Sequence, residues 1–164
     1  MKNIQFTGTP DNREISAITY DSRKVKPGTL FVAISGMQAD GHEFIPQAIE
    51  NGAVAILSNG RSPKTQAVPI FQVKDPRLAL SHISAQFYGN PSMAMNVVGI
   101  TGTNGKTSIT HTLYYILQNS GLNCGTLGTL GFRTPTGMMS TGFTTPESVE
   151  VQQMLQTLKM AEVD

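Results

Sequence analysis

The sequence has little cysteine, almost no net charge and no long apolar run. Cys124 is the only cysteine, which excludes a disulfide within the chain and a cysteine-based zinc site. The net charge of +1 gives no electrostatic reason to expect binding to nucleic acid or an anionic membrane. No apolar stretch approaches the ~18 residues that cross a bilayer, and residues 1–15 lack the apolar core of a signal peptide. We therefore expect a cytoplasmic protein without membrane insertion.

The composition is that of a globular chain with an apolar core. Hydrophobic residues make up 39% of the 164 residues and charged residues 14%, which excludes wholesale disorder. The length allows one domain, or a small domain with part of a second. A Gly-Asn-Pro-Ser stretch at 89–92 punctuates the chain. We predict two domains, residues 1–92 and residues 93–164.

The first half alternates strand and helix signals. Short apolar runs that follow turn residues predict strands at 29–34, 53–58 and 68–73. Apolar residues at helical spacing predict one helix that ends at Gly52, and a second that begins with Asp75 as N-cap and ends at Gly89. The order of strands and helices favours an α/β fold with parallel pairing.

The second half repeats the pattern but stops early. Strands are predicted at 94–101 and within 123–132, and helices at 107–119 and from Thr145-Pro146 onward. An open parallel sheet usually needs more strands to bury both faces. We therefore expect a chain that has been cut short, with a small N-terminal α/β domain and the start of a parallel-sheet domain.

A glycine-rich loop lies between the predicted strand at 94–101 and the predicted helix at 107–119. The stretch "GITGTNGKTSIT" has Ile100 where the usual phosphate-loop pattern has glycine. Gly102 and Gly105 nevertheless allow the backbone to approach a phosphate, and the helix start provides N–H groups and a favourable dipole. Lys106 can reach the terminal phosphates and Thr107 can hold Mg²⁺. A flexible turn with a surface lysine is the alternative.

The loop resembles the ATP loop of the Mur ligases and the related folylpolyglutamate synthases. The stretch "YDSRKVKPGTLFVAISGMQADGHEFIPQAIENGAVAIL" resembles the N-terminal UDP-binding domain of the Mur ligases, which folylpolyglutamate synthases lack. "GTLGTLGFRT" and "TGFTTPES" resemble the MurE type, which adds the third residue of the peptidoglycan stem peptide. The resemblance covers nearly the whole chain from Ile15 onward.

This resemblance implies an ATP-dependent ligase of peptidoglycan biosynthesis. ATP would phosphorylate the terminal carboxylate of UDP-MurNAc-L-Ala-D-Glu, and the amine of a free amino acid, diaminopimelate or lysine, would attack the acyl phosphate. Enzyme cations and Mg²⁺ would neutralise the charge that moves onto the phosphates. The resemblance also implies that a metal-binding glutamate and histidine, a carbamylated lysine and the domain that selects the amino acid lie beyond Asp164. We therefore expect this chain alone to be inactive.

The resemblance assigns site residues as follows. The ATP loop comprises Thr101, Gly102, Thr103, Asn104, Gly105, Lys106, Thr107 and Ser108, with Lys106 as the catalytic cation and Thr107 near the metal. The residues expected to contact the UDP-linked substrate are Tyr20, Ser22, Met37, Gln38, Ala39, Thr144 and Thr145.

Some of these residues have simpler structural explanations. Asp21 and Arg23 flank Ser22, and they can pair with each other or cap a turn instead of contacting uridine. Thr145 before Pro146 is a good helix N-cap whether or not it meets a phosphate.

Several other functions fit the same sequence features. A MurF-type or folylpolyglutamate-type ligase is the nearest alternative. A nucleotide-binding module without catalysis and an α/β scaffold with an idle loop are the others. The leading interpretation predicts a monomer with ATP and Mg²⁺ as cofactors, and no nucleic-acid partner.

Overall fold

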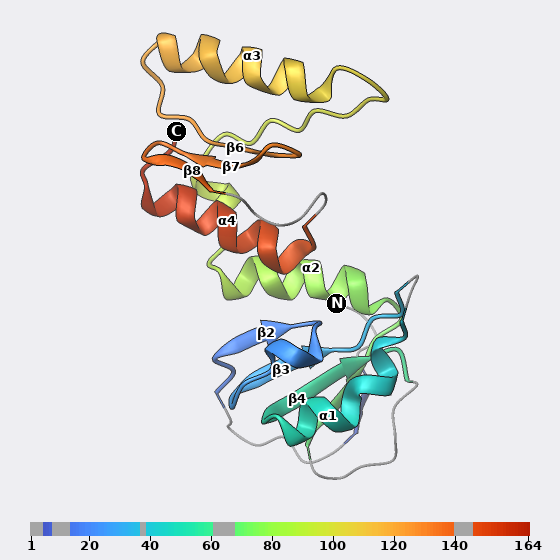
Figure 1. Ribbon diagram of the computed structural model, residues 1–164. Helices are drawn as coiled ribbons and strands as arrows, with labels where there is room; N and C mark the ends of the chain where they lie inside the picture. Colours follow the sequence, from blue (N-terminus) through green and yellow to red (C-terminus); the bar gives the residue numbers. More distant parts are fainter. Residues whose placement is uncertain (1–4, 8–13, 37–38, 61–67, 140–145) are drawn as a thin grey trace. The chain divides into compact units, whose positions relative to one another are not determined.

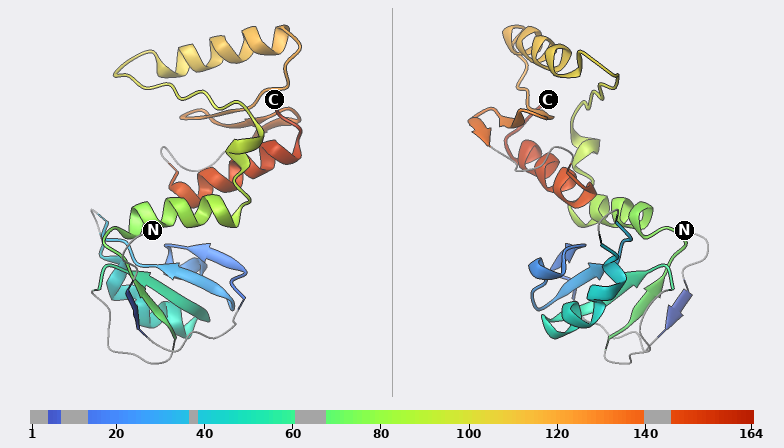
Figure 2. Two further views of the ribbon diagram at one scale, coloured as in Figure 1. Left: turned by 180° about the vertical axis from the view of Figure 1, so that it is seen from behind. Right: turned by 45° about the vertical axis from the view of Figure 1, so that its right-hand side comes forward.

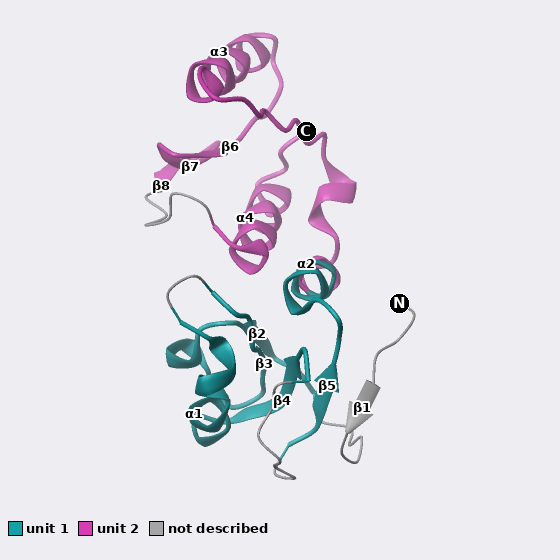
Figure 3. Ribbon diagram, turned by 90° about the vertical axis from the view of Figure 1, so that its right-hand side faces the viewer, with its two compact units in different colours: residues 1–83 teal, residues 84–164 magenta. Residues whose placement is uncertain are grey.

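The structure is a computed structural model that describes residues 5–7, 14–36, 39–60, 68–139 and 146–164. The chain divides into two compact units, Met1–Ile83 and Ser84–Asp164 (Figure 3). It passes from the first to the second inside helix α2 (Pro76–Phe87). The predicted domain boundary between residues 92 and 93 stays a prediction.

The first unit is built on a five-stranded sheet (Figure 1). Its strand order is β1-β5-β4-β3-β2, in which β2 to β5 are parallel and β1 pairs antiparallel with β5. The strands are β1 (Gln5–Thr7), β2 (Ala17–Thr19), β3 (Thr29–Val32), β4 (Ala53–Ser58) and β5 (Ile70–Gln72). The predicted α/β fold and the three predicted strands are confirmed.

The core of the first unit lies between the sheet and the short helix α1 (Ile45–Glu50). Ile45 and Ala48 of α1 pack in one cluster with Phe31 of β3 and Ile56 of β4, and all four are fully buried. Every residue of β3 is buried, which is typical of a parallel strand covered on both faces.

Two short 3-10 helices and one turn connect these elements. They are η1 (Ser22–Lys24) and η2 (Gly41–Phe44). The turn residues before β3 are Pro27 and Gly28, and Gly28 has a φ of +87°.

Helix α2 has the predicted ends. Oδ1 of Asp75 accepts a hydrogen bond from the Leu78 N–H at 3.0 Å. Pro76 is the first helical residue and Gly89 follows the last turn. The local capping signals were therefore sufficient to locate this helix.

The second unit contains an antiparallel sheet, and the expected parallel pairing is wrong there. Its sheet consists of β6 (Thr126–Gly128), β7 (Gly131–Thr134) and β8 (Gly137–Met139) in sequential order. The stretch predicted as one strand within 123–132 turns back at Thr129 and Leu130, because Gly128 pairs with Gly131. Alternating apolar residues do not show where a strand reverses, so the hairpin was missed.

Helix α4 (Ser148–Met160) packs against this hairpin (Figure 1, Figure 2). Leu155 and Leu158 are buried with Phe132 of β7 and form the apolar face of the helix. The predicted helix start is wrong, since α4 begins at Ser148 with Glu147 as N-cap. Glu147 has an extended backbone, so the helix cannot continue back to Thr145. Thr145 itself lies outside the described residues.

The segment predicted as a strand at 94–101 forms no strand in the described residues. It begins with the 3-10 helix η3 (Pro91–Ala94). Val97 and Val98 are 59% and 65% exposed. The segment is held by the Asn96 N–H, which donates to the Asp164 carbonyl at 3.2 Å, while the Asp164 N–H donates to the Asn123 carbonyl at 3.0 Å. A strand requires a partner, and the local sequence cannot show whether one is present.

Helix α3 (Lys106–Asn119) matches the prediction to within one residue. Tyr114 is its only buried residue, and the apolar Ile109 and Ile116 are more than half exposed. The described residues therefore cover few of the apolar side chains of α3. None of the helices in the described part of the chain combines the length and apolarity that crossing a bilayer requires.

Candidate functional site

The glycine-rich loop lies immediately before α3, as the sequence predicts. Residues 101–109 are all exposed. Gly102 has a φ of +151° and Gly105 a φ of +80°, which are conformations that glycine adopts without strain. The loop can therefore present its backbone to a ligand.

The start of α3 has no side-chain cap. Gly105 is the N-cap residue and offers no capping oxygen. The N–H groups of residues 102–105 donate no hydrogen bond to any described residue. Because these N–H groups and the positive end of the helix dipole face solvent, this helix start is suited to an anion.

Lys106 folds back over the loop that precedes it. Its Nζ donates to the Gly102 carbonyl at 2.5 Å and to the Thr103 carbonyl at 3.3 Å. The ammonium group is thus held beside the uncapped N–H groups without an anionic partner in the described residues. This position suits a group that neutralises phosphate charge.

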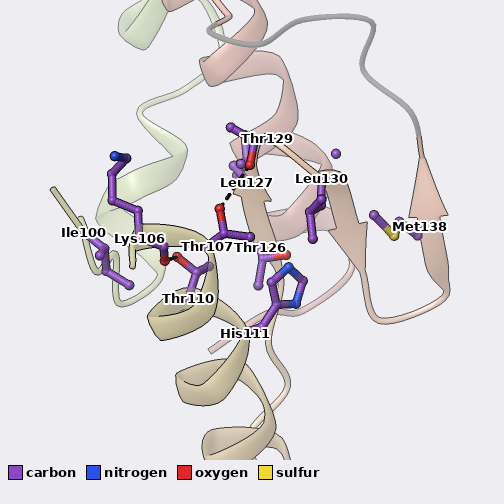
Figure 4. Close-up of a pocket in the computed structure, with 12 residues that line it drawn as sticks. Ile100, Lys106, Thr107, Thr110, His111, Thr126, Leu127, Thr129, Leu130 and Met138 are labelled. Atoms are coloured by element: carbon purple, nitrogen blue, oxygen red, sulfur yellow. Dashed lines mark hydrogen bonds between the residues drawn. The ribbon is translucent and has the colours of Figure 1, made fainter. Parts of the chain in front are cut away.

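Thr107 faces a pocket of about 160 Å³ beside the loop (Figure 4). The pocket is formed by Ile100, the first turns of α3 and the β6–β7 hairpin. Oγ1 of Thr107 lies 3.2 Å from Oγ1 of Thr129 in the hairpin turn. The loop, the lysine and this hydroxyl therefore share one exposed site.

Of the residues that line this pocket, the sequence predicted only Lys106 and Thr107 as site residues, and His111 and Thr129 are among those it missed. His111 lies four residues after Thr107, so helical spacing could have identified it as a neighbour. Thr129 is brought to the pocket by the hairpin, which no local signal predicted.

The donor groups at this site fit a magnesium–nucleotide complex. Mg²⁺ is usually held by one or two protein oxygens together with phosphate oxygens and waters. The Thr107 hydroxyl supplies such an oxygen on the pocket wall. No group of three or more histidine, cysteine, aspartate or glutamate side chains suited to a metal occurs among the described residues.

The residues predicted to contact a UDP-linked substrate are only partly described. Ser22 is 6% exposed, and its Oγ donates to Oε1 of Gln47 at 2.9 Å. Tyr20, at the end of β2, is half-buried, and Ala39 is exposed. Met37, Gln38, Thr144 and Thr145 lie outside the described residues.

Asp21 and Arg23 form an ion pair with each other, which was the predicted alternative to a contact with uridine. Two nitrogens of the Arg23 guanidinium donate to the Asp21 carboxylate at 2.9 and 2.7 Å. Asp21 also accepts from the Arg23 N–H and so caps η1. The side-chain hydrogen bond from Arg23 lowers the pKa of Asp21. These contacts give both side chains a structural role.

A narrow hairpin precedes η2 and carries the predicted contact Ala39. The Gly36 N–H donates to the Ala39 carbonyl and the Gly41 N–H to the Ile34 carbonyl, each at 2.9 Å. Oδ1 of Asp40 accepts from the Ser35 hydroxyl at 3.1 Å. The base of this hairpin is therefore fixed by backbone and side-chain hydrogen bonds.

Comparison with known proteins matches two family models along the chain. The model described as "Mur ligase family, catalytic domain" matches residues 14–88, and the "Mur ligase middle domain" matches residues 100–164. The UDP-N-acetylmuramoyl-L-alanyl-D-glutamate--2,6-diaminopimelate ligase of Syntrophomonas wolfei is 40% identical over 161 residues. That match covers 98% of this chain and 33% of the relative. The chain thus spans about a third of the length of the curated relatives it matches.

Solved structures give the same result. The MurF ligase of Thermotoga maritima in complex with ADP is 33% identical, with a TM-score of 0.51 over 67% of this chain and 25% of that protein. A UDP-N-acetylmuramoyl-L-alanyl-D-glutamate--2,6-diaminopimelate ligase has a TM-score of 0.68 over 88% of this chain and 29% of its own, and at 24% identity it supports the fold alone. The two family models match residues 14–88 and 100–164, and the alignment with the Syntrophomonas wolfei ligase covers 98% of this chain, so the chain belongs to the Mur ligase family.

Proposed function

We propose that this chain is part of a MurE-type ligase that adds the third amino acid to UDP-MurNAc-L-Ala-D-Glu with ATP. One observation carries the proposal: Lys106 and the uncapped start of α3 form a cationic, donor-rich site beside the pocket that Thr107 faces. The ADP complex of the similar Thermotoga maritima MurF supports nucleotide binding here.

In this proposal the loop holds the triphosphate. The N–H groups of residues 102–105 bind phosphate oxygens, and Ser108 in the first turn of α3 adds a hydroxyl. Lys106 exchanges its two carbonyl partners for the terminal phosphates, where it stabilises negative charge during transfer. Mg²⁺, held in part by Thr107, supplies further neutralisation of the phosphates.

The proposed contacts to the uridine diphosphate come from the first unit. Tyr20 after β2, Ser22 in η1, and Met37, Gln38 and Ala39 are proposed to contact the uridine diphosphate. Thr144 and Thr145 are proposed to hold the pyrophosphate and muramoyl part. Diaminopimelate is the favoured amino acid, because the relatives are named for it. We further propose a monomeric, cytoplasmic protein.

The function is tested by measuring ADP release with the full-length protein. We expect release that requires ATP, UDP-MurNAc-dipeptide and diaminopimelate together. Release that requires a UDP-MurNAc-tripeptide and D-alanyl-D-alanine would instead assign the MurF reaction. ATP binding without any amine-dependent release would identify a non-catalytic nucleotide-binding module.

The 164-residue chain gives a second test. We expect it to bind ATP without forming an amide bond. Amide formation by this chain alone would contradict the proposal that essential groups lie beyond Asp164.

A further inference from the structure

Thr129 occupies a defined position opposite Thr107. It lies in the two-residue turn between β6 and β7, which the pairing of Gly128 with Gly131 closes. The hairpin is anchored by Phe132, which is buried against Leu155 and Leu158 of α4. Its turn is therefore positioned by the core of the second unit.

The contact between Thr107 and Thr129 bears on the direction in which the Thr107 hydroxyl proton points. A hydroxyl group has one proton and two lone pairs. A threonine hydroxyl that binds a cation uses a lone pair for the metal, so its proton must point to another acceptor. Oγ1 of Thr129, 3.2 Å from Oγ1 of Thr107, provides such an acceptor (Figure 4).

The acceptor that a helical threonine usually finds lies outside the helix for Thr107. Thr110, one turn later, donates its hydroxyl to the Lys106 carbonyl four residues back at 2.8 Å. For Thr107 the residue four back is Thr103, which precedes the N-cap Gly105 and is not part of α3. The Thr107 side chain is turned toward the hairpin, as Figure 4 shows.

We propose that Thr129 is a positioning residue for the metal–nucleotide complex. It accepts the Thr107 proton and so keeps a Thr107 lone pair directed at Mg²⁺. This inference rests on the proposed function, because it requires that the loop binds a magnesium–nucleotide complex. Partners of this kind typically change metal affinity by about 10-fold or more when they are removed.

The test compares Thr129→Val with Thr129→Ser in the full-length protein. Valine keeps the shape and removes the acceptor, whereas serine restores the hydroxyl. Binding of a fluorescent ADP analogue is measured in EDTA and then over a Mg²⁺ titration. We expect Thr129→Val to raise by about 10-fold the Mg²⁺ concentration that gives half of the maximal increase in analogue affinity. The affinity of this variant for the analogue in EDTA should be unchanged. Thr129→Ser should behave as the wild type in both measurements.

The outcomes separate this inference from the function on which it rests. If wild-type protein does not bind the analogue at all, the proposed function fails first. If the wild type binds with a clear Mg²⁺ response and Thr129→Val responds identically, the positioning role is wrong. A loss of affinity that is equal with and without Mg²⁺ would show a merely structural role. Thr129→Ala takes the place of valine in the same comparison if the valine variant does not fold.

Discussion

Nδ1 of His42 lies 2.5 Å from Oδ1 of Asp40, at the base of the hairpin that carries Ala39. The carboxylate can only accept, so Nδ1 carries the proton in this contact. The same carboxylate oxygen accepts from the His42 N–H at 3.2 Å and caps η2. These hydrogen bonds, with the side-chain bond from His42 as the largest contribution, lower the pKa of Asp40 to about 2.

The Asp40 carboxylate should make stability depend on pH in the acid range. Its pKa in the folded chain is about 2, below the ordinary value of 3.8, so the folded state favours the ionised form. The stabilisation is fully present above about pH 4 and is lost as the pH falls toward 2. We expect Asp40→Asn to be less stable than the wild type at pH 6 and to approach it near pH 2.

Urea unfolding at a series of pH values measures this difference. Glu43→Gln serves as the control, because Glu43 is an exposed carboxylate in the same short helix. A stability difference between Asp40→Asn and the wild type that stays constant from pH 6 to pH 2 would contradict the prediction.

Lys106→Ala should weaken nucleotide binding with little change in the stability of the free chain. The side chain is exposed, so its truncation removes few packing contacts. A lost charge-assisted hydrogen bond corresponds to about 10-fold or more in affinity. Thermal unfolding with and without saturating magnesium–ATP checks both expectations. The control is Lys159→Ala, at an exposed position late in α4; an equal effect of ATP on both variants would exclude a phosphate contact by Lys106.

Gly125→Ala should destabilise the second unit through steric overlap. A Cβ at this position would lie 2.4 Å from Cδ2 of Leu158 and 2.9 Å from the Arg133 carbonyl oxygen. Crowding of this kind in a packed core costs about 1–3 kcal/mol. Gly99→Ala is the matched control, since a Cβ there meets no atom within 4 Å. Denaturant unfolding should show a change within about 0.5 kcal/mol for the control, and equal stability of the two variants would refute the packing argument.

Ser22→Ala should reduce both stability and binding of a uridine nucleotide. Removal of the buried hydroxyl breaks the bond to Gln47 and lowers the free energy of unfolding by about 1 kcal/mol. If Ser22 also contacts uridine, the dissociation constant for UDP should rise several-fold. Chemical unfolding and UDP titration measure the two effects. Reduced stability with unchanged UDP affinity would leave Ser22 with a role in the fold alone.

Sequence patterns predicted strands β3, β4 and β5 of the first unit because their signals are local, but they missed β1 and β2. The Pro27-Gly28 turn, the Asp75 cap and the apolar run of β4 each depend on neighbouring residues. The second unit was predicted less well. The reversal at Thr129 and Leu130 depends on pairing between Gly128 and Gly131, and the segment at 94–101 depends on a partner that its own sequence does not specify.

In the candidate site, too, residues with local signals were predicted and a residue brought in by packing was missed. Lys106 and Thr107 follow from the order of loop and helix, and the structure places them together at the start of α3. Thr129 joins them only because Phe132 and Leu158 pack the hairpin against α4. Proximity that arises from packing between distant segments has no signature in a local motif.

The Gly102 and Thr103 carbonyl oxygens compete with the proposed phosphate for the ammonium group of Lys106. To use all three N–H donors of Lys106, a phosphate bound as proposed would have to displace the Gly102 and Thr103 oxygens. The measured affinity is therefore the difference between two sets of hydrogen bonds, and the binding enthalpy will understate the strength of the lysine–phosphate contact.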